Sequence, residues 1–471
     1  MKIFGIKLTA CMVSPFIVLL SITPLHAGNA TWALNPQSGD WNTAANWTPP
    51  TVPNGPNDTA TFGVSNVTNL SISAGIEVAG IVFMAGASQF TIQIFDDAVI
   101  SGPGVTNNSG IVQNFAVGGS GSGGRISFMN TASAGNLTVY TNQSAAVNGQ
   151  LGGVTEFFNT STADNATLIA DGGTTTGAGG GMIVFHDSST AANATLIANG
   201  GTNGGDGGVI EFLDSSLGGT CRLIVATLST PGTVLISSHA PPGVTVGSIE
   251  GSGEVSLGAN KLTVGTNNLT TTFSGSIDGT GGSLTKIGTG TLTLSGANTY
   301  TGATMVNAGT LLLQKKANTS QTGTGNVVVN AGSLGGTGKA GGNVTIGNGS
   351  GPRGMLAPGI ANTGTFTVQK KLTFRADGTY NFEVNSNTAT ADNVVAKGVT
   401  IGAGALFSPV DLGTATLTSG TVFTVISNTP TTPIAGTFSN LPDGATIVIG
   451  SNTYLADYQG GDGNDLTLTV Q

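Results

Sequence analysis

The sequence predicts an all-β protein, a right-handed parallel β-helix (solenoid) with a cap at each end. Short segments of alternating apolar and polar residues recur along the chain, separated by Gly, Asn, Ser and Thr, and such alternation is typical of strands. One pattern also repeats at a nearly constant step. Because each repeating unit is too small to bury its own apolar face, the units must stack coil on coil.

The repeat is clearest in 121–243. The segments GGRISF, GGVTEF, GGMIVF and GGVIEF begin at nearly equal steps, at Gly123, Gly152, Gly180 and Gly207. An independent apolar series keeps the same steps, and it consists of Val139, Leu168, Leu196 and Leu223. Coils stack about 4.8 Å apart, so roughly sixteen coils would form a rod of roughly 75 Å.

Stacking at these steps predicts two ladders of identical side chains. The aromatic residue that ends each segment should join one internal ladder, made of Phe128, Phe157, Phe185 and Phe212. A second ladder should lie in a turn and pair side-chain amides up the stack. Its members are Asn136, Asn165 and Asn193.

The ends of such a stack expose unpaired backbone groups and need covers. Trp32, Trp41 and Trp47 all lie close together in a Pro-rich stretch near the start of the mature chain. We interpret them as an N-terminal cap that closes the core. The alternative is that the indoles stack on a carbohydrate.

Composition limits the partners of the protein. Charged residues are 8% of the chain, against about a quarter in an average globular domain. The net charge of −9 and the pI near 4.6 argue against nucleic acid as a partner, since nucleic acid needs a basic face.

The segment 1–27 is typical of a secretory signal peptide. Lys2 and Lys7 precede the apolar stretch LTACMVSPFIVLLSI, and PLHA ends at the small residue Ala27. The apolar run is short and contains a proline, so no membrane span is expected. Cleavage would remove Cys11 and leave Cys221 as a single thiol, which excludes an internal disulfide in the mature chain.

One stretch carries a family resemblance. LTKIGTGTLTLSGANTYTGATMVNAGTLLL, residues 284–313, resembles the autotransporter-associated β-strand repeat, also called the passenger-associated transport repeat. Flanking segments, including LAPG at 356–359 and the final FSNLPDGATIVIGSNTYLADYQGGDGNDLTLTV, extend the likeness over about 244–471. The resemblance implies an exported β-helical passenger in which the repeat assists secretion and folding.

The chain departs from that family at its C-terminal end. A membrane barrel needs many strands of about ten residues with aromatic girdles, and the sequence after Leu356 does not show them. We therefore expect no barrel, and either a separate export partner or release by a general route. The expected regions are a signal peptide (1–27), the N-terminal cap and first β coils (28–120), Gly-rich repeats of about 28 residues (121–243), the passenger-associated repeat β-helix (244–409) and a C-terminal β cap (410–471).

A calcium site is one chemical possibility. GGDGNDLTL, which starts at Gly460, partly fits the calcium-binding nonapeptide G-G-x-G-x-D-x-U-x. Asp462 and Asp465 are the candidate ligands. The U position is Thr467 instead of a large apolar residue, and only one copy occurs, so a terminal turn is the preferred interpretation.

Catalysis is a second possibility. Glu156 and Glu211 occupy equivalent positions two coils apart, roughly 10 Å, which is near the separation in inverting glycosidases. Val184 holds the same position between them. Arg125 is the only basic residue between Lys7 and Arg222, and this scarcity argues against an enzyme.

Other acidic groups add little to the enzyme hypothesis. His186 and Asp187 are adjacent on a strand and should point to opposite faces. Asp96, Asp97 and Asp171 could line a groove. The spacing of the acids along the chain predicts no acidic cluster on one face.

The sequence therefore predicts an exported structural or adhesive passenger that is secreted or displayed on the cell surface. We expect no catalytic activity of its own and no cofactor. The expected partners are an extracellular polysaccharide or the surface matrix, together with separate export machinery. The alternatives are a polysaccharide-active β-helix lyase or hydrolase and a calcium-binding surface module.

Overall fold

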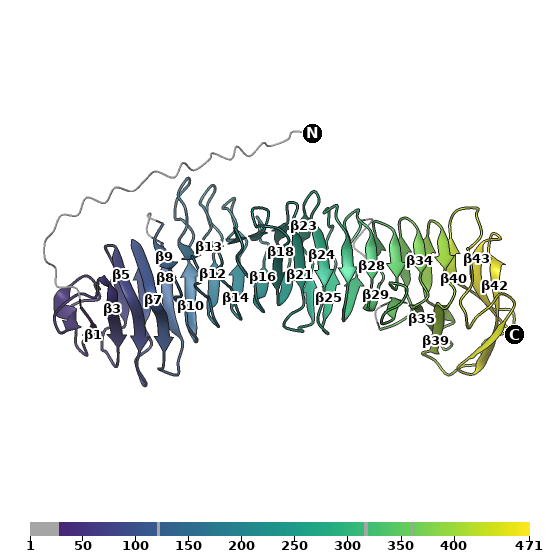
Figure 1. Cartoon of the computed structure of the whole chain (residues 1–471), viewed down its shortest axis with the longest axis horizontal. Helices are drawn as coiled ribbons and strands as arrows, with labels where there is room; N and C mark the ends of the chain where they lie inside the picture. Colours follow the sequence, from purple (N-terminus) through teal and green to yellow (C-terminus); the bar gives the residue numbers. More distant parts are fainter. Residues whose placement is uncertain (1–27, 120–122, 315–318, 360) are drawn as a thin grey trace.

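The protein is an elongated rod built from stacked β coils (Figure 1). The computed structural model describes residues 28–119, 123–314, 319–359 and 361–471, and the predicted signal peptide lies outside them. Strands cross the long axis and succeed one another from one end of the rod to the other. Within the described residues the one helical element is a short 3-10 turn, Ala44–Asn46. The predicted all-β parallel solenoid is confirmed.

The first sheet has twelve strands and covers the N-terminal half of the rod. Its strands, in sheet order, are β2 (Trp47–Thr48), β1 (Ala30–Trp32), β3 (Gly55–Phe62), β5 (Ile76–Phe83), β7 (Asp97–Asn107), β9 (Arg125–Phe128), β11 (Val154–Phe157), β13 (Met182–Phe185), β15 (Val209–Phe212), β17 (Thr233–Leu235), β20 (Glu254–Ser256) and β23 (Ser276–Asp278). All neighbours in this list are parallel except β1 and β2. Strands of 28–120 therefore continue directly into those of the later coils.

The second sheet has sixteen strands and runs along most of the rod. They are β4 (Asn69–Ile72), β6 (Thr91–Ile94), β8 (Gln113–Val117), β10 (Thr138–Asn142), β12 (Thr167–Ala170), β14 (Thr195–Ala198), β16 (Arg222–Val225), β19 (Ser248–Gly251), β22 (Thr271–Phe273), β25 (Thr291–Leu294), β27 (Thr310–Leu313), β29 (Gly332–Gly336), β32 (Gly354–Pro358), β35 (Gly378–Asn385), β36 (Thr390–Ala391) and β39 (Leu406–Asp411).

Two further sheets complete the C-terminal half. The third contains β18 (Gly243–Val246), β21 (Lys261–Val264), β24 (Ser283–Lys286), β26 (Thr304–Val306), β28 (Val327–Val329), β31 (Val344–Ile346), β34 (Leu372–Phe374) and β38 (Val399–Ile401). The fourth contains β30 (Lys339–Ala340), β33 (Thr365–Val368), β37 (Asn393–Ala396), β40 (Val422–Asn428), β43 (Asp465–Val470), β42 (Asn452–Gly460) and β41 (Thr446–Ile449).

Identical side chains stack inside the N-terminal half. The rings of Phe128, Phe157, Phe185 and Phe212 are fully buried. Successive ring centroids lie 4.9, 4.8 and 5.0 Å apart and the ring planes are nearly parallel. This spacing is about the distance between neighbouring coils, so each ring packs directly on the ring of the next coil.

Aromatic residues also close the first end of the core. Trp32, Trp41 and Trp47 are at most 2% exposed and surround Phe62 with ring centroids 5.6–6.2 Å away. Each indole N–H donates to a backbone carbonyl, for example Trp41 Nε1 to Pro53 O at 3.2 Å. Buried indoles offer no face to a sugar, and their packing is that of a cap.

At the second end, the segment 429–441 covers the last strands of the second and third sheets, and β43, β42 and β41 end the fourth sheet (Figure 1). Phe438 is fully buried and packs on Phe374 and Phe407, with centroids at 5.2 and 5.7 Å. The free edge of β39 is covered by one side chain, because Asn440 accepts from Phe407 N at 2.9 Å and donates to Phe407 O at 2.7 Å. The next backbone group on that edge belongs to Pro409, which has no N–H.

Amide ladders line the turns. The side-chain amide of Asn165 donates to Asn136, and Asn193 Nδ2 donates to Asn165 Oδ1 at 3.1 Å. The ladder continues into Thr220, whose hydroxyl donates to Asn193 Oδ1 at 2.5 Å. All of these side chains are exposed, so the ladder ties neighbouring coils together at the surface.

Candidate functional site

Acidic side chains gather on the outer face of the first sheet. In register, one outward column runs through Glu77, Val99, Ser127, Glu156, Val184, Glu211, Leu235, Ser256 and Asp278. The adjacent outward column carries Asp97, Arg125 and Glu254. The two columns together hold four of the six Glu residues of the chain.

This acidic face differs from the sequence prediction that no acidic cluster would form on one face. The number of residues between paired positions of neighbouring coils is larger from Val184 to Glu211 than from Ser256 to Asp278. The repeat step aligns Glu156 with Glu211, but a fixed period does not bring Glu77 or Asp278 into line with them. Only the strand register shows that these two acids share the column.

Three side chains contact one another at the N-terminal part of the face. Glu156 is 9% exposed, and Arg125 Nη1 lies 3.2 Å from its Oε2. His186 Nε2 lies 3.7 Å from Glu156 Oε1. Neither Glu156 Oε2 nor His186 Nε2 takes part in a hydrogen bond with the described residues.

Next to this cluster the rings of Phe158 and His186 stack face to face, with centroids 4.3 Å apart and planes at 4°. Asp187, the neighbour of His186, points elsewhere and accepts from Asn159 N at 2.8 Å. His186 and Asp187 thus do not form a dyad. They follow the end of β13 in a turn, where Asp187 has φ 53°, and do not lie on a strand as the sequence predicted.

The two carboxyls proposed from sequence as a catalytic pair stand on one column with Val184 between them. Burial raises the pKa of Glu211, and the nearby His186 opposes this shift. Arg125 supplies a cation beside Glu156, which the scarcity of basic residues in the sequence had argued against.

The acids further along the face interact with each other. Glu254 and Asp278 come from neighbouring strands, and a hydrogen bond between the two carboxyls, together with burial, raises the pKa of Glu254. Ser256 Oγ also donates to Asp278 Oδ1 at 3.0 Å. Lys and Arg side chains form no ion pair with these two acids within the described residues.

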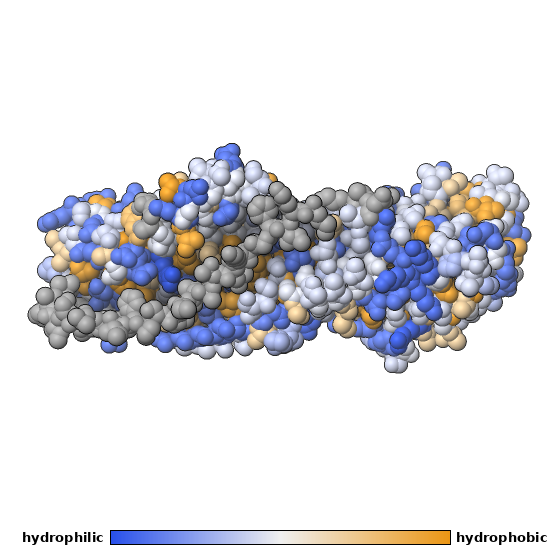
Figure 2. Space-filling view, turned by 90° about the horizontal axis from the view of Figure 1, so that it is seen from above, coloured by the Kyte–Doolittle hydropathy of each residue, from blue (hydrophilic) through white to orange (hydrophobic). Residues whose placement is uncertain are grey.

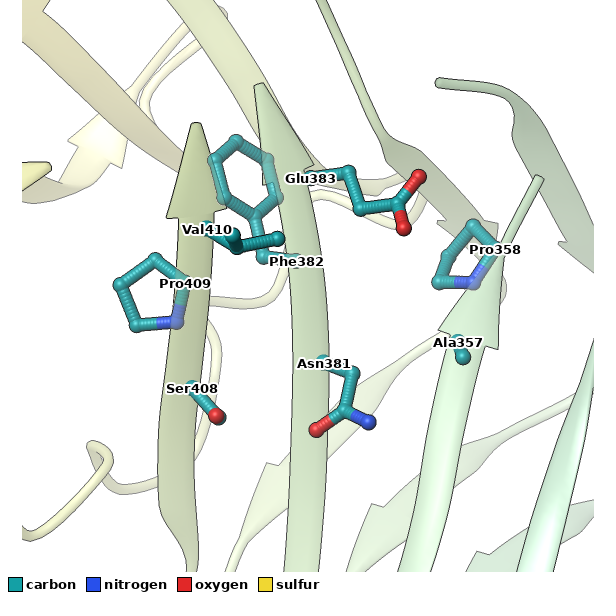
Figure 3. A pocket seen from close by; sticks show the side chains of 8 residues that line it. All are labelled: Ala357, Pro358, Asn381, Phe382, Glu383, Ser408, Pro409 and Val410. Carbon is teal, nitrogen blue, oxygen red and sulfur yellow. The ribbon is translucent and has the colours of Figure 1, made fainter. Parts of the chain in front are cut away.

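Two hollows lie on other surfaces. One, of about 400 Å³, lies at the base of the Gly-rich loops, where Asn199 Nδ2 donates to Asp171 Oδ1 at 3.0 Å. The other, of about 210 Å³, lies on β32, β35 and β39 (Figure 3) and is lined by Asn381, Glu383 and Ser408. Burial raises the pKa of Glu383.

The proposed calcium ligands lie in a tight turn between β42 and β43. Gly460 pairs with Asp465 across it. Asp465 Oδ1 accepts from Asn428 N at 2.8 Å, so this carboxylate holds the neighbouring strand. No group of three or more His, Cys, Asp or Glu side chains is placed to hold a metal ion in the part of the chain that the structure describes.

Sequence reasoning missed a second turn ladder. The backbone N–H of Asn130 donates to Asn159 Oδ1, that of Asn159 to Asp187 Oδ2 and that of Asp187 to Asp214 Oδ2, at 2.8–3.0 Å. These four residues have φ between 49° and 57°. The signal was present, because an Asn or Asp follows each ladder Phe at the same repeat step and these residues tolerate left-handed backbone.

Sequence reasoning also missed the burial of a charge. Lys286 is 1% exposed and points into the core between Val264 and Val306. Its Nζ donates to the carbonyls of Ile287 at 2.5 Å and Gly288 at 3.0 Å. Burial lowers the pKa of Lys286 to about 8.

Comparison with known proteins confirms the family resemblance over 284–313, which match the passenger-associated transport repeat. A segment of 106 residues, 22% of this chain, is 38% identical to the adhesin BmaC autotransporter of Brucella suis biovar 1 (strain 1330) and spans 3% of that protein. The crystal structure of the Haemophilus influenzae Hap adhesin is similar at 13% identity and a TM-score of 0.24, over 88% of this chain and 59% of that one. The chain thus spans less than two thirds of the length of either relative.

None of the described helices is long and apolar enough to cross a membrane.

Proposed function

We propose that this chain, which carries the passenger-associated transport repeat, is an exported adhesive passenger whose solenoid displays contact surfaces away from the cell. The observation that carries the proposal is the position of the matched repeat. Residues 284–313 supply β24, β25, β26 and β27 of one uninterrupted stack. Export through residues 1–27, and a secreted or surface location, belong to the same proposal.

A stack of this kind suits adhesion for a physical reason. Its backbone hydrogen bonds run along the rod between coils, so outward side chains are free to vary without loss of the fold. Outward positions alternate with core positions on every strand, and each sheet thus presents a flat surface. The relative BmaC is an adhesin, which supports this assignment.

The test is an adhesion assay with the full chain. Cells that express it with residues 1–27 intact should place it in the medium or on the surface, and beads coated with residues 28–471 should adhere to extracellular matrix or to polysaccharide films. Beads coated with a folded acidic protein of similar charge are the control. Adhesion no greater than that control on every surface would refute the proposal.

One observation favours a second candidate, a polysaccharide-active enzyme. The carboxylate of Glu156 lies within 3.7 Å of both Arg125 and His186, and Glu211 stands two strands away. Incubation with plant, algal and bacterial polysaccharides should then release reducing or unsaturated ends, and Glu156→Gln should abolish the release. If no substrate yields product, this candidate fails while adhesion stands.

A further inference from the structure

The N-terminal half of the rod has an unusual charge balance. Residues 28–260 contain 14 Asp and Glu but only two basic residues, Arg125 and Arg222, which gives a net charge of −12. Residues 261–471 contain 9 acidic and 10 basic residues, a net charge of +1. Nearly all the negative charge of the mature chain therefore lies in one half.

Within that half the two basic residues are already engaged. Arg222 Nε donates to Glu250 Oε1 at 2.6 Å on the second sheet, and Arg125 lies beside Glu156. On the first sheet this leaves Glu77, Glu211, Glu254 and Asp278 without an ion-pair partner among the described residues. Most of the negative charge on the outer face of the first sheet is thus not neutralised by ion pairs among the described residues.

The residues between the acids are aliphatic. Val154, Met182, Val209 and Leu235 are partly exposed on the same two outward columns. Lys and Arg side chains combine a charged head with an apolar stem. A surface on which carboxylates alternate with aliphatic side chains is complementary to both parts of such residues.

The same face is poorly suited to sugars. Sugars stack on the faces of aromatic rings, and the aromatic pair here, Phe158 and His186, already covers one face of each ring by stacking. Glu156 differs from the other acids of the face, because its Oε2 is almost fully covered and lies 3.2 Å from Arg125 Nη1. The acceptors that the face offers to a partner are therefore the partly exposed carboxylates of Glu77, Glu211 and Glu254.

We propose that the outer face of the first sheet, from β5 to β23, is a docking surface for a polypeptide partner rich in Lys and Arg. The inference rests on the adhesive function proposed above and names its partner class. The face spans nine strands, about 40 Å, and about 15 Å across, or on the order of 600 Å². This area is at the low end for a specific interface, so charge complementarity provides fast, salt-sensitive capture.

The test compares two triple variants with the same change in charge. Glu77→Gln/Glu211→Gln/Glu254→Gln removes three charges from the face. Asp164→Asn/Asp171→Asn/Asp206→Asn removes three charges from turns and loops of the same half and is the matched control. Circular dichroism and the Tm establish that both remain folded.

Binding is measured with an immobilised 20-residue peptide of alternating Lys and Ala, against its Glu counterpart and neutral dextran. The wild-type chain should bind the Lys peptide alone, and more weakly at higher salt. The face variant should lose about tenfold in affinity and the control less than twofold. Equal losses in both variants, or wild-type binding to dextran instead of the Lys peptide, would overturn the proposal.

The adhesion assay separates this inference from the function on which it rests. If the face variant adheres to matrix as the wild type does, the docking face is wrong while the adhesive function stands. If the wild type adheres to nothing, the function itself is wrong.

Discussion

The Gly-rich repeats and the middle of the rod solve the same packing problem in different ways. In the Gly-rich repeats, long coils such as the one from Phe157 to Phe185 enclose a ladder of stacked phenylalanines. Over 244–346 the coils are shorter, as between Val329 and Ile346, and the core is mostly aliphatic. There Val, Leu and Ile fill the interior in place of stacked rings.

The halves also differ in where they place charge. The most buried charged residues of the first half, Asp58 and Glu156, keep 8% and 9% exposure, whereas the second half buries Lys286 and Asp392 at 1% and 0%. In Figure 2 strongly hydrophilic and hydrophobic residues are interspersed toward both ends of the rod, and the middle is near neutral. One backbone architecture thus accepts two kinds of interior and two kinds of surface.

The largest expected effect would test the aromatic interior. Phe157→Ala removes a ring that stacks on two others and should cost about 3–5 kcal/mol, measured by urea unfolding with circular dichroism. Phe158→Ala, next to it but facing outward, is the control and should cost far less. Equal losses would mean that the ladder does not set the stability of this half.

The second prediction concerns a buried acid of the C-terminal half. Asp392 accepts from Gly364 N and Glu383 N at 2.8 and 2.9 Å, yet burial raises its pKa to about 7. The folded chain then binds more protons than the unfolded chain between about pH 4 and pH 7. Stability should fall as pH rises through that window, by up to about 4 kcal/mol.

The measurement is the free energy of unfolding from pH 4 to pH 8. Asp392→Asn should flatten the profile, and Glu383→Gln isolates the contribution of the neighbouring carboxyl, whose pKa burial also raises. A wild-type profile as flat as that of Asp392→Asn would contradict the assignment.

The third prediction tests the buried cation. Lys286→Met keeps the length of the side chain but leaves the carbonyls of Ile287 and Gly288 without their donor. The expected cost is about 1–3 kcal/mol, seen as a lower urea midpoint. Met305→Leu, on the outer face of the next strand, is the control. If Lys286→Met has a higher urea midpoint than the wild type, the buried ammonium destabilises the core.

The smallest effect is expected at the surface ladder. Asn165→Ala breaks the amide chain between Asn136 and Asn193 and should cost about 0.5–1.5 kcal/mol, as a small shift of the urea midpoint. Thr167→Ala, on the outer face of a nearby strand, provides the reference. If Asn165→Ala lowers the free energy of unfolding as much as Phe157→Ala does, the exposed amides contribute as much stability as the core, and the prediction is wrong.

The sequence predicted the fold because its repeat step is visible. Phe128 to Phe212 recur at nearly fixed intervals, and a fixed interval in a solenoid means a shared column. The acidic face was not predictable in this way. Glu211 and Asp278 align only through the register of β15, β17, β20 and β23, and turn lengths that vary from coil to coil set that register.

Lys286 was hidden for a related reason. Strand alternation assigns a residue to the inside or the outside only when the ends of the strand are known. A charged residue on a strand is usually assigned to the outside. The carbonyls that accept hydrogen bonds from this ammonium belong to a turn, and residue propensities do not predict where those carbonyls point.

The covered edge of β39 has a consequence for crowded surfaces. A bare strand edge is a template on which another chain can add its own strand, and repeated addition produces fibrils. Asn440 occupies the first pairing position and Pro409 removes the donor from the next. Many copies held side by side would therefore remain separate rods along this edge, each with its lateral faces free for contact.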